Sequence, residues 1–305
     1  MSTHRNLLII AAAGLVLLGT VPPAVAQDAD LRLELSSLKA SYLVAEPVVL
    51  RMRLTNASSL RIQSVSPELG VETQLTSLYI AAPGGEFELY DPGFVEEPSR
   101  PLRELGPGDS LAHDQQVIFH WPAKDFAFPA AGAYRVKAVF HGFGLRPDVE
   151  SNVVEIRITA PSGADADALR LFRRQEVALL AMSVDESPQA VQSLETLMTR
   201  HGGSVYADYA QFYLARRETR EHLSRPPNPR RAIELYEGLM KRAPSFVLSD
   251  EAYFGLGAMY LRLNEPQKAR ESFNKVLDRS SDSELKRRSQ DVLESLVATE
   301  DQSGA

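Results

Sequence analysis

The sequence predicts a multidomain β + α chain, with an antiparallel β-sandwich in its first half and an α-helical solenoid in its second half. From residue 31 to about residue 160, apolar residues alternate with polar ones, as in Leu31, Leu33 and Leu35, and turn residues separate the runs. From about residue 165, the apolar spacing is helical and small residues recur in pairs at similar distances. The two halves are therefore expected to be different kinds of domain.

Residues 1–26 have the pattern of a secretory signal peptide. Arg5 precedes an apolar run from Leu7 to Leu18, which is followed by the small-residue site Ala24-Val25-Ala26. The run is short beside the ~20 residues that span a bilayer, and Pro22 and Pro23 disfavour the alternative of an uncleaved anchor. We expect cleavage after Ala26, a periplasmic or secreted mature protein, and no membrane insertion once the signal is removed.

Composition and charge exclude several classes of protein. The 305 residues include no cysteine, so disulfides, thiol nucleophiles and cysteine–zinc sites are excluded. Once Arg5 is removed with the signal, residues 27–161 carry a net charge of −6 and residues 162–305 a net charge of −2. Neither half offers the basic surface that phosphate binding requires. Nucleic acid is therefore not an expected partner.

The expected sandwich occupies residues 27–161 and contains about seven short strands. Alternation is strict around Tyr134, Val136 and Ala138, and it recurs in a last strand around residues 154–158. Turn residues gather where the strands should reverse, for example at residues 106–109. This rhythm favours two packed antiparallel sheets.

Two segments of this half resemble bacterial immunoglobulin-like domains. Residues 46–56 read as a strand that runs into the turn residue Asn56, and residues 128–137 read as the turn that enters the F strand of such folds. In this resemblance, the hydroxyl of Tyr134 returns a hydrogen bond to nearby backbone. The resemblance implies a fold and carries no active site with it.

Residues 91–101 form a long irregular connection within this half. Long loops on a rigid frame often bind ligands, and the alternative is a plain crossover between sheets. A short polar linker at residues 160–165 marks the domain boundary. The helical domain is thus expected over residues 162–305.

The clearest motif of the helical half is a set of large and small residues with fixed spacing. It comprises Tyr253, Leu256, Gly257, Tyr260, Ala269 and Phe273. Gly257 and Ala269 would let two antiparallel helices approach closely, while Tyr260 and Phe273 fill the space beside the crossing. This spacing resembles the tetratricopeptide repeat, a helix–turn–helix unit of about 34 residues. Such repeats usually hold partners.

Two earlier copies precede this motif. Their small residues are Ala178 with Ala190, and Ala215 with Ala232. The separation is twelve residues in the first and third copies and seventeen in the middle copy, whose turn therefore carries five extra residues around residues 223–229. Residues 281–284 have capping-box spacing and predict a last, capping helix. The alternative is a helix bundle with chance spacing.

No arrangement of residues points to catalysis. The histidines lack the i, i+4 spacing of a zinc protease, and neither a nucleophile elbow nor a phosphate-binding glycine loop is present. Glu96 and Glu97 are adjacent on an extended loop, where neighbouring side chains point apart. We therefore expect no enzymatic activity, no metal site and no cofactor.

A binding face is predicted from the repeat register. In the resemblance to tetratricopeptide arrays, the first helix of each pair lines a concave face. The residues at its partner-facing positions are Phe172, Gln175, Tyr209, Phe212, Arg216, Arg220, Phe254 and Arg262. Aromatic rings flanked by arginines suit an extended peptide with apolar side chains and a carboxylate. The alternative is that these aromatic side chains pack against one another or against the sandwich.

The expected function is that of an exported, noncatalytic adaptor or scaffold, which holds a protein or peptide partner of the cell envelope. Two alternatives place the activity in the sandwich instead, as a site for a glycan or cell-wall ligand or as a protease-inhibitor loop at residues 91–101. The partner, the biological process and the oligomeric state stay open at this point.

Overall fold

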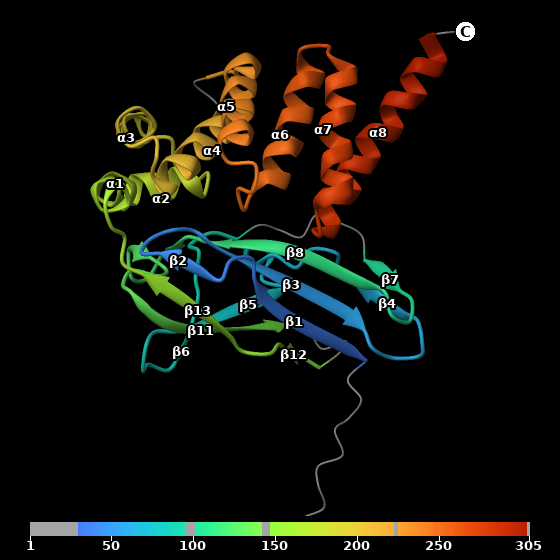
Figure 1. The fold of residues 1–305 in the computed structure, drawn as a ribbon. Helices are drawn as coiled ribbons and strands as arrows, with labels where there is room; N and C mark the ends of the chain where they lie inside the picture. Colours follow the sequence, from blue (N-terminus) through green and yellow to red (C-terminus); the bar gives the residue numbers. More distant parts are fainter. Residues whose placement is uncertain (1–29, 96–101, 142–146, 223–224, 304–305) are drawn as a thin grey trace, which may run out of the picture.

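The computed structural model describes residues 30–95, 102–141, 147–222 and 225–303. The predicted signal peptide and residues 96–101 of the predicted connection lie outside these residues. Sheets make up the first part of the chain and helices the second, as Figure 1 shows. We call residues 30–161 the β region and residues 162–303 the helical region. A mixed β + α fold is thus present.

A three-stranded antiparallel sheet contains β1 (Leu31–Ser37), β3 (Val48–Asn56) and β8 (Ser110–Val117), in the order β1-β3-β8. The predicted alternation in β1 is confirmed, because Leu31, Leu33 and Leu35 are buried while the residues between them are exposed. β8 forms one edge of this sheet, which places its outer backbone groups toward the helices.

The second sheet has six strands, with β12 (Val149–Glu150) paired to β11 beside the main order β2-β13-β11-β5-β6. Its other strands are β2 (Ser41–Leu43), β5 (Thr76–Ala81), β6 (Phe87–Leu89), β11 (Gly132–Phe140) and β13 (Val154–Thr159). All its pairs are antiparallel except β2 with β13, which are parallel. The purely antiparallel prediction misses this pair, because the segment between β1 and β3 crosses to the second sheet.

Short elements complete the β region, and they raise the number of strands above the seven expected. They are β4 (Ile62–Val65), the 3₁₀ turn η1 (Val71–Thr73), β7 (Arg103–Leu105), β9 (Phe119–His120) and β10 (Asp125–Phe126). The predicted tyrosine hydrogen bond is confirmed. The hydroxyl of Tyr134 donates to the carbonyl oxygen of Ala130 at 3.1 Å and accepts from the N–H of Ala130 at 3.3 Å.

The described part of the helical region contains eight helices, and consecutive helices lie beside one another in Figure 1. They are α1 (Ala164–Phe172), α2 (Gln175–Ala181), α3 (Pro188–Arg200), α4 (Val205–Thr219), α5 (Pro229–Arg242), α6 (Ser249–Arg262), α7 (Pro266–Arg279) and α8 (Ser283–Ser303). None of these helices combines the length and apolar character that crossing a membrane requires.

The small residues predicted at helix crossings are buried there. A β-carbon placed on Gly257 of α6 would lie 2.7 Å from the ring of Phe273 of α7, so the ring packs directly against the glycine backbone. Ala178, Ala190, Ala215 and Ala232 are likewise fully buried. Close helix contact at these positions therefore depends on the absence of a larger side chain.

Two helices begin with a capping side chain followed by proline. The side chains of Ser187 and Asn228 accept hydrogen bonds from backbone N–H groups of the helices that follow, each with proline as its first residue. The longer middle turn is also present, since residues 220–228 separate α4 from α5. Ion pairs of Arg225 with Glu186 (3.2 Å) and Glu218 (3.3 Å) hold this turn against its neighbours.

A seam of buried aromatic side chains joins the two regions. Phe172 lies between Phe126 of the β region, with ring centres 5.9 Å apart, and Tyr206 of α4, at 5.0 Å. The hydroxyl of Tyr206 donates to the carbonyl oxygen of Val44 at 2.6 Å. The hydroxyl of Tyr209 donates to buried Glu46 at 3.0 Å. Burial of this apolar surface, with its polar ends bonded, attaches α1 and α4 to the β region.

Candidate functional site

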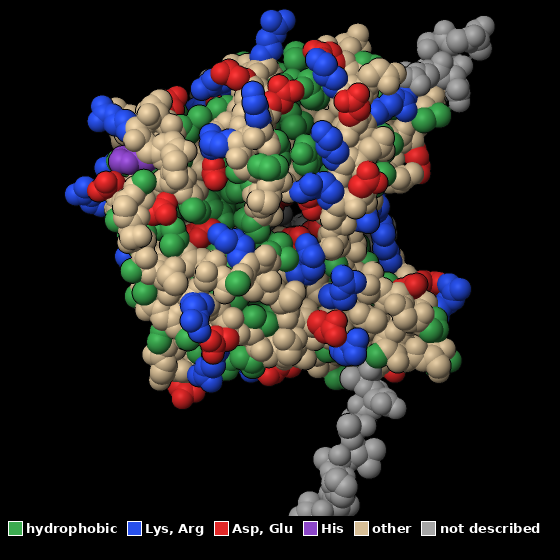
Figure 2. Space-filling model, viewed as in Figure 1, with side chains coloured by type: hydrophobic (Ala, Val, Ile, Leu, Met, Phe, Trp, Pro, Cys, Tyr) green, Lys and Arg blue, Asp and Glu red, His purple; other side chains and the backbone are tan. Residues whose placement is uncertain are grey.

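A cleft lies between the β region and the helical region, beside the aromatic seam. Its cavity has a volume of about 410 Å³. β8 and the segment Tyr90–Phe94 form its β side, and α4, α6 and the first turns of α8 form its helical side. Figure 2 shows a hollow between the helices and the sheets, with hydrophobic side chains beside it and charged side chains of both signs around it.

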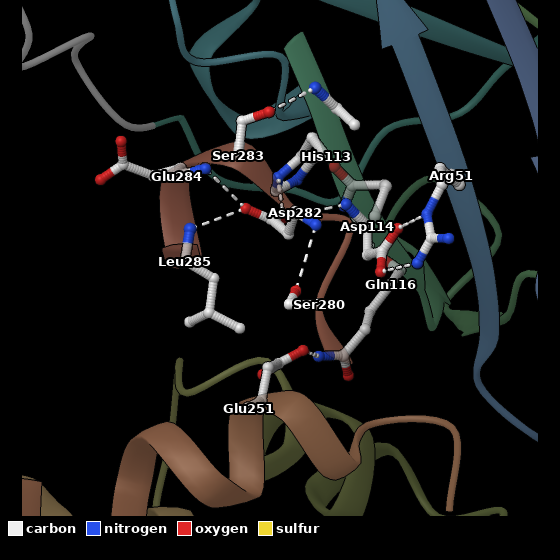
Figure 3. A network of polar contacts seen from close by, with 12 residues as sticks. Arg51, His113, Asp114, Gln116, Glu251, Ser280, Asp282, Ser283, Glu284 and Leu285 are labelled. Carbon is white, nitrogen blue, oxygen red and sulfur yellow. Dashed lines mark hydrogen bonds and ion pairs between the residues drawn. The ribbon is translucent and has the colours of Figure 1, made fainter. Parts of the chain in front are cut away.

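One wall of the cleft is made where α8 meets the edge of β8. An edge strand presents N–H groups without sheet partners. The Oγ of Ser283 accepts a hydrogen bond from the N–H of Ala112 at 2.9 Å, and Oδ2 of Asp282 accepts from the N–H of Asp114 at 3.0 Å (Figure 3). Two side chains at the start of α8 therefore complete the edge of β8.

Asp282 also begins α8. Its Oδ1 accepts hydrogen bonds from the N–H groups of Glu284 at 2.9 Å and Leu285 at 2.8 Å (Figure 3). The sequence pattern predicted Ser281 as the capping residue, and this prediction is wrong by one position. The carboxylate of Asp282 accepts more bonds than a serine hydroxyl can, and it is favoured by the positive end of the helix dipole.

His113 of β8 is the charged partner of Asp282. Its Nδ1 lies 3.1 Å from Oδ2 of Asp282. Burial opposes the charge on His113, but the hydrogen bond and the negative charge of Asp282 outweigh it and raise the pKa of His113. Burial likewise opposes the charge on Asp282, and the same hydrogen bond together with the imidazolium charge lowers the pKa of Asp282. The pair is therefore favoured in its ionised form.

Glu251 of α6 spans the cleft to β8. Its Oε1 accepts a hydrogen bond from Nε2 of Gln116 at 2.8 Å (Figure 3), and its Oε2 lies 3.9 Å from Nη1 of Arg216. Burial raises the pKa of Glu251, while Arg216 and Gln116 act in the opposite direction without cancelling that effect. The carboxyl group thus forms a second polar link between the helices and β8.

Two arginines of the cleft lie over aromatic rings. The guanidinium carbon of Arg216 is 5.5 Å from the ring centre of Phe212, and that of Arg288 is 4.4 Å from the ring centre of Phe254. Arg216 is engaged by the backbone of Ala181 and by Glu251. Arg288 is exposed, and no carboxylate among the described residues pairs with it. Arg288 is therefore a cation available to a ligand.

The other charged groups of the cleft already have partners. Asp114 forms two hydrogen bonds with Arg51, each at 2.7 Å (Figure 3), and Glu284 forms two with Arg287, each at 3.0 Å. Across the part of the chain that the structure describes, no group of three or more histidine, aspartate or glutamate side chains is placed to hold a metal ion. Among the described residues, the cleft therefore offers a ligand an aromatic wall beside one guanidinium without an ion-pair partner, that of Arg288.

Three of the eight predicted binding residues border this cleft: Phe212, Arg216 and Phe254. Phe212 is itself fully buried, so only Arg216 and Phe254 present accessible side chains. The structure places Phe172 and Tyr209 in the aromatic seam, where they are fully buried. Those two are not available to a partner, because the β region covers the helix face that the repeat register predicted to be open. For Phe172 and Tyr209 the alternative prediction is therefore correct, because both side chains pack against the β region.

The remaining predicted residues lie elsewhere. Gln175, Arg220 and Arg262 are exposed and do not line the cleft. Phe172 and Gln175 were also expected on one helix, but the extended backbone of Arg174 separates α1 from α2 between them. In the predicted connection at residues 91–101, the described part contributes Pro92 and Phe94 to the cleft.

Sequence reasoning missed four residues of the site: His113, Glu251, Asp282 and Arg288. The signal for Asp282 was present in the capping-box pattern, which was assigned to the serine before it. Arg288 follows Asp282 by six residues on the predicted capping helix, and no binding role was predicted for that helix. The partners of His113 and Glu251 come from distant parts of the chain, so no local pattern identifies these two residues.

Comparisons with known proteins give only weak likenesses. No protein-family model matches the chain, and no curated protein matches it. Among solved structures, it is similar to a β-glucosidase from Listeria innocua, with 14% identity over 43% of this chain and 16% of that chain and a TM-score of 0.25. It is also similar to the sporulation control protein Spo0M from Bacillus subtilis, with 8% identity over 47% of this chain and 54% of that chain and a TM-score of 0.26. A third likeness is to β-glucuronidase from Bacteroides uniformis, with 12% identity over 74% of this chain and 32% of that chain and a TM-score of 0.23. The chain thus spans at most 54% of the length of these proteins, and likenesses of this strength establish neither a family nor an activity.

Proposed function

We propose that this chain is an exported, noncatalytic binding protein of the cell envelope, which holds a segment of a partner protein in the cleft between its two regions. The helical region would be a tetratricopeptide-like array and the β region an immunoglobulin-like sandwich. The observation that carries the proposal is the stacking of Arg288 on Phe254 at the mouth of a cavity of about 410 Å³. A ligand can contact the ring and the cation together.

The chemistry of this pair selects the kind of segment. Phe254 is half-buried and offers an apolar wall for an aliphatic or aromatic side chain. Arg288 lacks an ion-pair partner among the described residues, so a ligand carboxylate can bind its guanidinium through two parallel hydrogen bonds. The best ligand is therefore a segment with an apolar side chain next to a carboxylate, as at the carboxyl terminus of a polypeptide.

The aromatic seam between the two regions must stay intact in a binding experiment. Separating the β region from the helical region would expose Phe172, Tyr206 and Tyr209, all fully buried in the intact chain. Isolated halves would then capture proteins through this exposed apolar surface. The experiment therefore uses the whole mature chain, residues 27–305.

A tagged mature chain is used to capture partners from the envelope fraction, and Arg288→Ala is compared with Arg262→Ala. Both arginines are exposed and helical, but only Arg288 lines the cleft. We expect Arg288→Ala to weaken capture of a specific partner by about tenfold, as one lost charge-assisted contact does, and Arg262→Ala to leave it unchanged. Equal capture by both variants would remove the cleft from consideration.

A further inference from the structure

Edge strands of the two larger sheets differ in how their outer backbone groups are bonded. The N–H and the carbonyl oxygen of Leu35 in β1 both bond to the side-chain amide of Asn152, each at 2.9 Å. The N–H of Leu43 in β2 donates to Glu46 at 2.8 Å. β8 is completed by the start of α8, as described above. At these positions the side chains occupy places that a strand of another protein would need, whereas the outward N–H groups of Leu31 and Leu33 in β1 have no such partner among the described residues.

β6 forms one outer edge of the six-stranded sheet. Tyr90 donates its N–H to Leu78 of β5 at 2.8 Å, and Glu88 pairs with Ile80 in the same ladder. In an antiparallel pair, bonding alternates along the strand, so the backbone groups of Phe87 and Leu89 point away from β5. Among the described residues, no hydrogen-bond partner reaches the outward N–H groups of these two residues. Leu89 is also 53% exposed.

A second cavity, of about 320 Å³, runs along β6. Its apolar lining includes Ile80, Phe126, Ala127 and Tyr134, and Glu86 and Glu88 lie at its rim. Both glutamates are exposed, and neither has an ion-pair partner among the described residues. A lysine or arginine side chain matches this lining, because its methylene groups can lie along apolar walls while its charge reaches the carboxylates.

We propose that β6 is a strand-addition site for an extended, basic segment of a partner protein. The segment pairs with the outward backbone groups of Phe87 and Leu89 and places a lysine or arginine side chain in the adjacent cavity, next to Glu86 and Glu88. Its alternate side chains lie on the outer face of the sheet beside exposed Leu89. Backbone pairing supplies affinity in this mode, and the cavity supplies selectivity.

Direct binding of a defined peptide tests the proposal. The mature chain is titrated against a fluorescent peptide of alternating lysine and valine, with a control peptide in which proline replaces valine. We expect binding of the first peptide only, because proline cannot form a continuous strand. The amide hydrogens of Phe87 and Leu89 should exchange more slowly in the complex. Equal binding of both peptides, or no binding of either, would overturn the proposal.

Two pairs of variants locate the contact. Leu89→Pro removes an N–H that points away from β5, and Leu89→Ala shortens the same side chain while keeping that N–H. We expect about a tenfold loss of affinity for Leu89→Pro and at most about a threefold loss for Leu89→Ala. Glu86→Gln combined with Glu88→Gln should also weaken binding by about tenfold. Arg288→Ala, which alters the first cleft, should leave it unchanged.

These variants also separate the site from two rivals. The proposal would be overturned if Leu89→Pro and Leu89→Ala bound the peptide with equal affinity and the variant that combines Glu86→Gln with Glu88→Gln bound it as tightly as the wild type. Self-association of the wild-type chain that Leu89→Pro abolishes would identify a second copy as the occupant, and would overturn it as well.

Discussion

The imidazole Nδ1 of His113 lies 3.1 Å from the carboxylate Oδ2 of Asp282, which joins an edge strand of the β region to the first turn of the last helix. The two residues belong to different regions and form one wall of the cleft. Asp282 is held by backbone N–H groups from both sides, those of Asp114 and of α8. The position of α8, and with it that of Arg288, therefore depends on this contact.

The first prediction concerns pH. The raised pKa of His113 means that its contribution to stability is fully present below its unfolded value of about 6.5 and is lost as pH rises through the folded value. The lowered pKa of Asp282 gives a contribution that is present above its unfolded value of about 3.9 and is lost as pH falls through the folded value. Both contributions are complete between about pH 4 and pH 6.5.

Urea unfolding of wild type and His113→Asn checks this window. The wild type should exceed the variant in free energy of unfolding by about 1–2 kcal/mol near pH 5.5, as expected for a hydrogen bond between charged groups, and by less near pH 8.5. His201→Asn serves as the control variant, since His201 lies outside the cleft at the end of α3, and it should not reproduce this pH dependence. A pH-independent difference for His113→Asn would show that the pair is not ionised.

The second prediction concerns the cap of α8. Asp282→Ala removes the acceptor of three backbone N–H groups, from Asp114, Glu284 and Leu285. We expect a loss of about 2 kcal/mol or more in the free energy of unfolding, since a helix cap and an interface contact are lost together. Asp291→Ala, an exposed position further along α8, should cost less than about 0.5 kcal/mol. Similar losses for the two variants would contradict the role assigned to Asp282.

The third prediction concerns close helix packing. In Gly257→Ala, the added β-carbon would lie 2.7 Å from the ring of Phe273, which is itself buried. Overpacking costs about 1–3 kcal/mol, which exceeds the gain of up to about 1 kcal/mol from placing alanine in a helix. A net loss of stability is therefore expected in thermal or urea unfolding. Gly203→Ala meets no atom within 4 Å and should be neutral or mildly stabilising.

The origin of the Gly257→Ala loss can be checked with a second substitution. Phe273→Leu in the Gly257→Ala background shortens the opposing side chain, so part of the lost stability should return. An additive loss in the double variant would mean that the two residues do not interact.

The fourth prediction concerns the seam. Because Phe172 and Tyr209 are buried against the β region, residues 27–161 and 162–305 produced as separate chains should each expose apolar surface and should bind each other when mixed. Size-exclusion chromatography of the mixture should show a one-to-one complex. Two separate, monodisperse species that do not associate would contradict the seam as a stable interface.

Local patterns predicted the elements well and their assembly poorly. Alternation in Leu31, Leu33 and Leu35 follows from the geometry of a strand, and the packing of Phe273 on Gly257 follows from that of a helix pair, so both could be read from spacing alone. The register also identified Phe172, Tyr209 and Phe212 as one face of the helices. Spacing contains no information about what covers a face, and here the β region covers most of it.

The candidate site shows the same limit. Phe212 and Arg216 of α4 and Phe254 of α6 were predicted and do border the cleft, because the repeat register places them at equivalent positions of two helices. Arg288 was missed because its partner Phe254 lies on another helix, α6. His113 was missed because Asp282 reaches β8 only after the chain has passed through seven helices of the described structure. Such contacts depend on tertiary packing, which no single-sequence period reports.

Site-specific photo-cross-linking from the cleft shows whether a partner protein is held there. A photoreactive amino acid replaces Thr219, which lines the cavity, or Arg262, which is exposed outside it, in the full mature chain within intact cells. We expect a cross-linked partner from position 219 only. Mass spectrometry should locate the link in a segment that carries an apolar side chain next to a carboxylate. Cross-links of equal yield from both positions, or from position 262 alone, would contradict a partner held in the cleft.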